Sequence, residues 1–102
     1  MAHASQSLSS DSIKNYVIVD YLNDWWVGFV VEKDNAKEMA RINFLHPKGP
    51  AKSFQYPSKP DVLDVPFCDI LSEADMSTAT GPNYKLKKAS QDEASKILRS
   101  RI

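Results

Sequence analysis

The chain has 102 residues, 42% of them hydrophobic and 25% charged, which is enough for one domain with a modest core. Lys plus Arg and Asp plus Glu both total 13, and this neutral net charge disfavours a dedicated nucleic-acid binder. Cys68 is the single cysteine, which excludes an internal disulfide and a cysteine-based metal site, and we expect it to be a small core residue.

Residues 1–12 are polar and rich in Ser and Ala, which is typical of a flexible arm. They contain no apolar segment like that of a secretory signal peptide. No apolar run in the chain approaches the ~20 residues of a membrane span. We therefore expect an intracellular protein, with the nucleus as one candidate location, and no membrane partner.

Three strands are predicted next, each marked by β-branched and aromatic residues and separated from the others by polar turns. They cover residues 16–19, 25–33 and 39–45. Short connections of this kind join antiparallel neighbours, so the strands are expected to form a meander. Gly28 lies inside the second strand, where a glycine indicates a bend or a close backbone approach, as at the corner of a small barrel.

The segment after the meander is interrupted by prolines. Residues 46–50 contain two prolines and a glycine, so they are predicted to form a loop. Short strands are predicted at residues 53–56 and 62–65, and residues 69–71 are expected to complete the sheet. The fold class predicted for residues 13–71 is therefore mainly β, a small barrel of about five strands.

The C-terminal part combines a linker, an edge strand and a helix. Residues 72–83 are small and polar and are predicted to be a linker, whereas residues 84–102 are predicted to form an edge strand and a helix packed on the barrel. Ser90 and Glu93 have the spacing of a capping box, so the helix is expected to start at Ser90 and to run to about residue 99. Its apolar side chains, Ile97 and Leu98 among them, should face the barrel.

Motifs for catalysis and metal binding are missing from the sequence. It has no phosphate-binding loop, no dinucleotide-binding glycine motif, no nucleophile elbow and no zinc-protease motif. The two histidines lie far apart in the sequence, His3 in the arm and His46 beside a proline. We therefore predict a binding module that is not an enzyme and uses no cofactor or metal.

Aromatic residues stand out around the first three strands. Trp25 and Trp26 are consecutive, and since alternate residues of a strand point to opposite faces, both cannot lie in one core. Tyr21 ends the first strand, Trp26 opens the second and Phe44 ends the third. In an antiparallel meander these positions share one edge, so the three rings should be neighbours. They either stand open to grip a ligand, with Asp24 at the rim, or pack together as a lid.

Residues 21–30, with the sequence YLNDWWVGFV, resemble the Tudor-type SH3-like barrels, in which an aromatic, an acidic turn, an aromatic, a small residue and a valine follow in this order. Phe44 is similar to the aromatic that ends the third strand of that family, and residues 65–71 are similar to its last short strand. The resemblance covers about residues 14–71 and implies an SH3-like, or Tudor-like, barrel.

The chain is also similar to a little-characterised module of invertebrate and fish proteins, some of them transposon-related. The matching segments are residues 44–50 (FLHPKGP), Phe54, residues 56–57, residues 65–71 and Tyr84, together with the final helix. This second similarity implies a fold rather than a function.

The Tudor resemblance implies an aromatic cage with a polar rim. Its walls would be Tyr21, Trp26, Phe44 and His46, and its rim would be Asp24 or Asn23. A methylated Lys or Arg is a large, weakly hydrated cation, and each contact with such a ring contributes ~0.5–2 kcal/mol. The implied function is recognition of a peptide, with a methylated histone tail as a candidate. The long Pro-rich loop departs from the family, which has a short loop with a second aromatic there.

Two other functions are compatible with the sequence. A nucleic-acid-binding barrel would stack bases on Tyr56 or Trp25 and contact phosphates through its lysines. These lysines are Lys48, Lys52, Lys59, Lys85, Lys87 and Lys88. The second alternative is a purely structural domain of a larger chromatin- or transposon-associated protein. The placement of the lysines and the openness of the aromatic group separate the alternatives.

Overall fold

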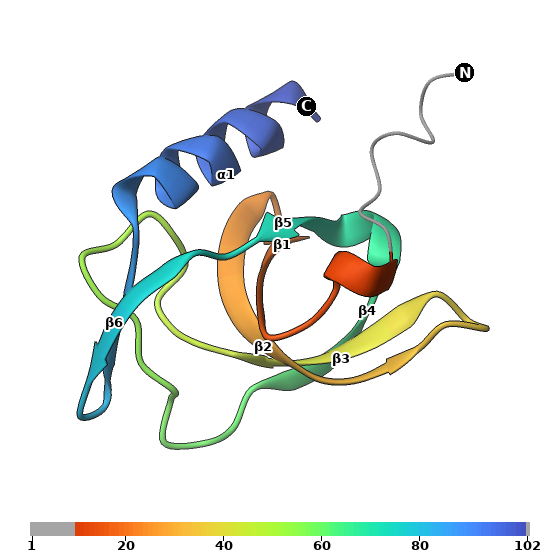
Figure 1. The fold of residues 1–102 in the computed structure, drawn as a ribbon, viewed down its shortest axis with the longest axis horizontal. Coiled ribbons are helices and arrows are strands. Elements are labelled where there is room, and N and C mark those ends of the chain that lie inside the picture. Colours follow the sequence, from red (N-terminus) through yellow and green to blue (C-terminus); the bar gives the residue numbers. More distant parts are fainter. Residues whose placement is uncertain (1–9, 102) are drawn as a thin grey trace.

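The computed structural model describes residues 10–101, with residues 78–80 described by their backbone alone. Its elements are η2 (Ser10–Ser12), β1 (Tyr16–Tyr21), β2 (Asp24–Asp34), β3 (Met39–Phe44), β4 (Val62–Pro66), η3 (Phe67–Asp69), β5 (Ile70–Glu73), β6 (Met76–Thr80), β7 (Asn83–Leu86) and α1 (Lys88–Ser100). β1 to β5 form one antiparallel sheet in the order β4-β3-β2-β1-β5, and β6 and β7 form a separate hairpin (Figure 1). The predicted mainly β fold with five strands and a C-terminal helix is confirmed.

The sheet is curved, but the predicted closure into a barrel is wrong. β4 and β5 are its two edges and do not pair with each other, although η3 connects the end of β4 directly to the start of β5. The curvature runs through β2, which pairs with β1 over residues 24–29 and with β3 over residues 28–34. One long strand therefore belongs to both halves of the sheet, as the bent orange ribbon in Figure 1 shows.

Gly28 lies where the two halves of β2 overlap, paired with both Val17 and Phe44. A Cβ atom at this position would lie 2.1 Å from Cγ2 of Ile42, which is far too close for two carbon atoms. Glycine is needed here because the side chain of Ile42, on the neighbouring strand, fills the space directly against its backbone. The predicted close approach at Gly28 is therefore confirmed.

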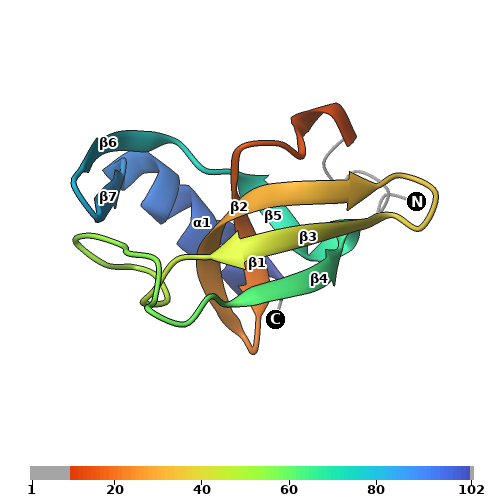
Figure 2. The same ribbon diagram turned by 90° about the horizontal axis from the view of Figure 1, so that it is seen from below.

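Alternation along the strands builds two hydrophobic clusters, one on each face of the sheet. The inner cluster comprises Ile13, Val17, Val19, Ala40, Ile42, Phe44, Val65, Phe67 and Ile70. The helix cluster comprises Ile18, Trp25, Val27, Leu45, Phe54, Leu71, Leu86 and Ala94. Ile97 and Leu98 pack against the helix cluster, which confirms the predicted docking of the helix. Figure 2 shows the helix behind the sheet, on the side of this cluster.

The helix starts earlier than the sequence predicts. Lys87 occupies the N-cap position and Ser90 lies inside the first turn, where it is buried. The Ser90 hydroxyl accepts a hydrogen bond from the backbone N–H of Asp75 at 3.2 Å, so it ties the helix to the segment after β5. The capping-box prediction is wrong because this tertiary contact uses the hydroxyl that the local pattern assigned to the helix backbone.

The middle of the chain also differs from the prediction. Residues 53–56 form two isolated bridges, Phe54 with Tyr84 and Gln55 with His46, because the proline loops on both sides leave too few residues for a strand. Residues 76–80, expected in the 72–83 linker, form β6 and pair with β7.

The chain differs from the prediction at two further places. Cys68 is exposed rather than in the core, because the turn of η3 buries Phe67 and directs the next side chain outward. The arm predicted for residues 1–12 falls mostly on residues 1–9, which lie outside the described residues, and Ser10–Ser12 form η2. Within residues 10–101, no helix is both long and apolar enough to cross a membrane.

Candidate functional site

The candidate site begins at the tight turn between β1 and β2. Tyr21 pairs with Asp24, and the two residues between them, Leu22 and Asn23, have φ angles of 56° and 66°. A turn with positive φ at both central positions matches the twist of a hairpin and favours Asn or Gly. Leucine pays a steric cost there. Its side chain is 72% exposed, so the turn places a large apolar group at the end of the sheet.

The two tryptophans after this turn lie on opposite faces of β2. Trp25 belongs to the helix cluster, is 2% exposed and donates its Nε1–H to Oγ of Ser95 in α1 at 3.0 Å. Trp26 is half-buried against the inner cluster and donates its Nε1–H to the carbonyl of Tyr21 at 3.3 Å. The prediction that the two tryptophans do not share one core is confirmed, and Trp26 is the one that faces the open end.

Side chains from β1, β2, β3 and the start of β4 surround a pocket of about 170 Å³ at this end of the sheet. Its lining residues are Tyr21, Leu22, Trp26, Phe44, Asp61 and Leu63, and we name it the Trp26 pocket. Phe44 is buried and belongs to the inner cluster, so its ring forms the base of the pocket. The three rings that the sequence placed at one end, Tyr21, Trp26 and Phe44, do lie around this single pocket.

His46, predicted as a further wall, does not line the pocket but contacts two residues that do, Trp26 and Asp61. The imidazole of His46 packs against Trp26, with ring centroids 5.2 Å apart and planes at 59°. Its Nε2 lies 2.7 Å from Oδ2 of Asp61, a distance that orients the carboxylate beside the pocket. The backbone holds Asp61 as well, since its carbonyl accepts a hydrogen bond from the N–H of Phe44 at 2.8 Å.

Asp24, predicted at the rim, does not line the pocket. Its carboxylate lies 3.2 Å from Nζ of Lys48 in the proline loop, and this ion pair accounts for its position. Asp61 takes the place beside the rings, and it was not predicted there because it follows the long proline loop rather than one of the first three strands. The available signal was alternation: Asp61, Leu63 and Val65 share one face, and Val65 is buried in the inner cluster.

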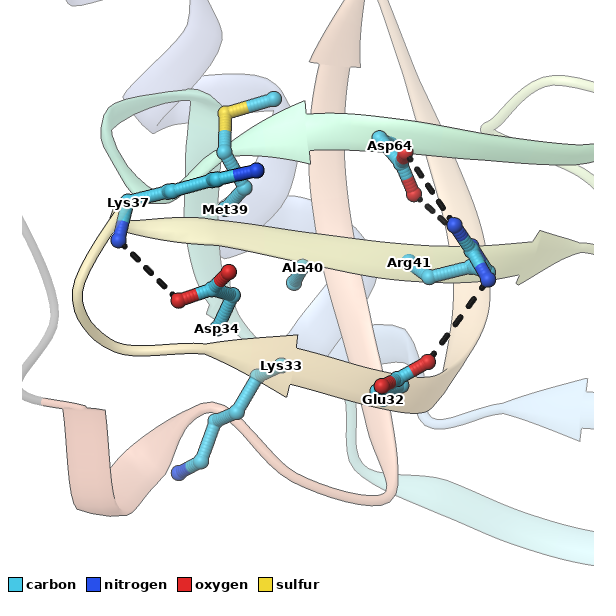
Figure 3. A pocket seen from close by; sticks show the side chains of 8 residues that line it. All are labelled: Glu32, Lys33, Asp34, Lys37, Met39, Ala40, Arg41 and Asp64. Carbon is cyan, nitrogen blue, oxygen red and sulfur yellow. Dashed lines mark hydrogen bonds and ion pairs between the residues drawn. The ribbon is translucent and has the colours of Figure 1, made fainter.

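A larger hollow of about 300 Å³ lies along the outer side of the β2–β3 hairpin (Figure 3). There Arg41 lies between two carboxylates, 2.9 Å from Asp64 and 3.6 Å from Glu32. The hydrogen bond with Asp64 raises the pKa of Arg41, and the charges of both carboxylates add to the effect. These groups pair with each other on an exposed surface, where ion pairs are weak, so this hollow offers a ligand little free charge.

A row of aromatic rings lies on the side of the helix cluster. Tyr16 contacts Phe29 at 5.1 Å and Tyr84 at 6.1 Å between ring centroids, and Tyr84 contacts Tyr56 at 5.5 Å. Burial raises the pKa of Tyr56, and a side-chain hydrogen bond with Tyr16 adds to the effect. Because three of these rings pack against the helix cluster, the row joins the loop before β4 to the sheet.

Some of the residues proposed for nucleic-acid binding are engaged in contacts within the chain. Trp25 is enclosed by the helix cluster and is not available for stacking on a base. Three of the six lysines form ion pairs within the chain: Lys48 with Asp24, Lys87 with Asp75 and Lys88 with Asp92. These pairs reduce the positive charge that phosphate contacts require.

Among residues 10–101, no group of three or more His, Cys, Asp or Glu side chains is arranged to hold a metal ion. No family model, curated protein or solved structure matches the chain. The likeness to Tudor domains therefore stays an expectation from the sequence.

Proposed function

We propose that the protein is a non-enzymatic module that binds a peptide by taking one of its side chains into the Trp26 pocket. This proposal is carried by one observation: three aromatic rings and one oriented carboxylate line the same pocket. The rings are those of Tyr21, Trp26 and Phe44, and the carboxylate is that of Asp61. Aromatic faces attract cations, and a carboxylate adds negative charge. The pocket therefore favours a side chain that is cationic and also apolar at its surface, such as a methylated lysine or arginine.

The size of the pocket supports a single side chain as the ligand. Its volume of about 170 Å³ is below the ~300–1,000 Å³ that is usual for small-molecule sites. Apolar groups surround its mouth, since Tyr21 is 41% exposed, Leu22 72% and Leu63 36%. Clustered exposed apolar side chains are typical of a surface that contacts another protein. A peptide satisfies both features, because one residue enters the pocket while its neighbours cover the rim.

The strained turn supports the same surface. Leu22 has a positive φ that a leucine rarely adopts, and its exposed side chain lines the pocket. Strain of this kind is concentrated at functional sites, where a less favourable residue is retained for its contacts. A methylated histone tail has the chemistry that the pocket favours, and it is the candidate ligand for a chromatin-associated protein.

The proposal is tested with the acetylated methylamide derivative of trimethyllysine, measured by chemical-shift titration. Its neutral isostere, with carbon in place of the charged nitrogen, is the control ligand. We expect the cation to bind about fivefold more tightly, which corresponds to ~1 kcal/mol of cation–π attraction. Equal affinities for the two ligands would contradict the proposal, because only the charge differs between them.

Three variants locate the binding. Trp26→Ala should abolish it, and Asp61→Asn should lower the affinity for the cation more than the affinity for the isostere. Phe29→Ala is the matched control, because it removes an aromatic ring that contacts Tyr16 on the other face. Unchanged binding by Trp26→Ala, or an equal loss in Phe29→Ala, would remove the Trp26 pocket as the site.

A further inference from the structure

Among the hydrogen bonds of residues 10–101, some backbone groups have no partner at the edge of the sheet next to the Trp26 pocket. β4 pairs with β3 alone, and the N–H of Phe44 donates to the carbonyl of Asp61. In an antiparallel pair, the residues of one strand alternate between facing the partner strand and facing away. Asp61 and the residues at positions 63 and 65 therefore face β3, whereas Val62 and Asp64 direct their N–H and C=O groups away from the sheet.

The far end of β4 confirms this register. The N–H of Phe67 donates to the carbonyl of Glu38 at 2.9 Å. Phe67 is an even number of residues from Asp61, so both hydrogen bonds fit the same alternation along β4. No backbone hydrogen bond joins the outward groups of Val62 or Asp64 to another residue between 10 and 101. This part of the edge therefore offers two N–H donors and two carbonyl acceptors, and Pro66, which has no N–H, ends it.

This free edge and the Trp26 pocket are continuous. Asp61 and Leu63 line the pocket, and Val62, between them, is 43% exposed on the opposite face. A strand placed along β4 would cover both Val62 and Leu63. Its residue opposite Leu63 would direct its side chain to the same face as Leu63, because directly paired residues share a face at about 5 Å. That side chain would point toward the pocket.

We infer that the ligand peptide binds as an added antiparallel strand along β4, so that the Trp26 pocket holds one side chain of a segment fixed in extended form; this rests on the proposed function. Main-chain hydrogen bonds to Val62 and Asp64 supply affinity, and the pocket supplies selectivity for the cationic residue. Figure 2 shows β4 at the border of the sheet, with no strand along its outer side.

Charge identifies the occupant as a basic segment of another protein. Asp64 is already paired with Arg41 at 2.9 Å, whereas Asp61 contacts only the imidazole of His46 among the described ion pairs. A second copy of the chain pairing through its own β4 would bring the sequence VLDVP to this edge, which contains an acid and no Lys or Arg. Such pairing would leave Asp61 without a cation, so the chain's own β4 does not fit the site.

The test compares the single trimethyllysine derivative with a heptapeptide that has trimethyllysine at its centre and alternating Thr and Val on both sides. An added strand should make the heptapeptide bind at least about tenfold more tightly than the derivative. If the derivative binds and the heptapeptide binds no better, the inference of an added strand is wrong, whereas the Trp26 pocket remains the binding site. If neither ligand binds, the proposed function itself is contradicted, and the added strand with it.

Backbone methylation of the heptapeptide tests the register. In the antiparallel arrangement, the residues on both sides of trimethyllysine face Val62 and Asp64, and trimethyllysine itself faces away. N-methylation of either neighbouring residue should therefore lower the affinity about tenfold, whereas N-methylation of the central residue should change it little. Equal affinities for all methylated peptides, or a loss at the central amide alone, would overturn the inference.

A variant of the protein tests the same contact from the other side. Val62→Pro removes one outward N–H, and an edge strand tolerates proline where its N–H faces solvent. We expect Val62→Pro to bind the heptapeptide no better than the single derivative, with its affinity for the derivative unchanged. Val62→Thr, which keeps the N–H, should behave as the wild type does. A Val62→Pro protein that is folded and binds the heptapeptide normally would contradict the added strand.

Discussion

Trp25 and Trp26 are adjacent in β2 and lie in very different surroundings. α1 and the segment between β3 and β4 cover one face of the sheet, so Trp25 is enclosed, with its Nε1–H bonded to Ser95. At the other face Trp26 packs on the inner cluster but lines an open pocket, with its Nε1–H bonded to the Tyr21 carbonyl. Alternation assigns the two rings to different faces, and the elements that cover each face decide which ring serves stability and which faces a ligand.

The largest expected effect is the difference between removing each tryptophan. Trp25→Ala should lower the free energy of unfolding by ~3–5 kcal/mol, because it leaves a cavity in the helix cluster. Trp26→Ala should cost only about 1–2 kcal/mol, because its ring is already partly in contact with water. Urea denaturation of both variants measures the difference. Equal losses would show that the open face contributes as much to the core as the covered one.

Gly49 tests how tightly the covered face is closed. Its N–H donates to the Trp25 carbonyl at 2.9 Å, and a Cβ at this position would lie 2.1 Å from Cη2 of the Trp25 ring. Gly49→Ala should therefore destabilise the protein by ~1–3 kcal/mol through overpacking. In a Trp25→Phe background, which removes the colliding atoms, the same substitution should cost much less. A cost that is the same in both backgrounds would mean that the ring does not cause it.

Leu22 allows a gain in stability at the open end. Leu22→Asn places a residue that tolerates positive φ in the β1–β2 turn. The free energy of unfolding should therefore rise by about 0.5–1 kcal/mol. The same change removes an apolar side chain from the pocket rim and should weaken binding of the trimethyllysine heptapeptide. Thermal melting and peptide titration of this variant measure the two effects. A variant that gains stability and binds as well as the wild type would remove Leu22 from the site.

The smallest expected effect is the contribution of Tyr56 to the free energy of unfolding, which changes with pH only in alkaline solution. Burial raises its pKa above the ordinary value of about 10, so the folded state favours the protonated phenol. Its contribution is therefore fully present below about pH 10 and is lost as the pH rises above that value. Urea unfolding at about pH 8 and about pH 11 should show a smaller loss for Tyr56→Phe than for the wild type. Equal losses would mean that this phenol stays exposed.

The sequence predicted those parts of the fold that depend on neighbouring residues. Polar turns and β-branched runs located the meander, and alternation separated Trp25 from Trp26. Ser90 shows the limit of local patterns, because its hydroxyl bonds Asp75, 15 residues away, instead of capping its own helix. Cys68 shows another limit, since its residue type predicts a small core side chain, whereas the turn of η3 buries Phe67 and leaves Cys68 exposed.

The candidate site was predicted in part for the same reason. Tyr21, Trp26 and Phe44 come from strands joined by short turns, so their positions along the meander were enough to bring them together. Asp61 reaches the pocket only after the long proline loop, and its contact with His46 spans 15 residues without a periodic pattern. Asp24 was misplaced because its partner Lys48 lies in that same loop.

The most direct test of the central claim observes both indole N–H signals in one nitrogen–proton correlation spectrum during titration with the trimethyllysine heptapeptide. Trp26→Phe assigns the signals, because it removes one of them. The Trp26 signal should shift with the peptide and saturate, while the Trp25 signal, bonded to Ser95 beneath α1, should stay in place. A shift of the Trp25 signal alone, or no shift of either signal at saturating peptide, would contradict the assignment of the open face to ligand binding.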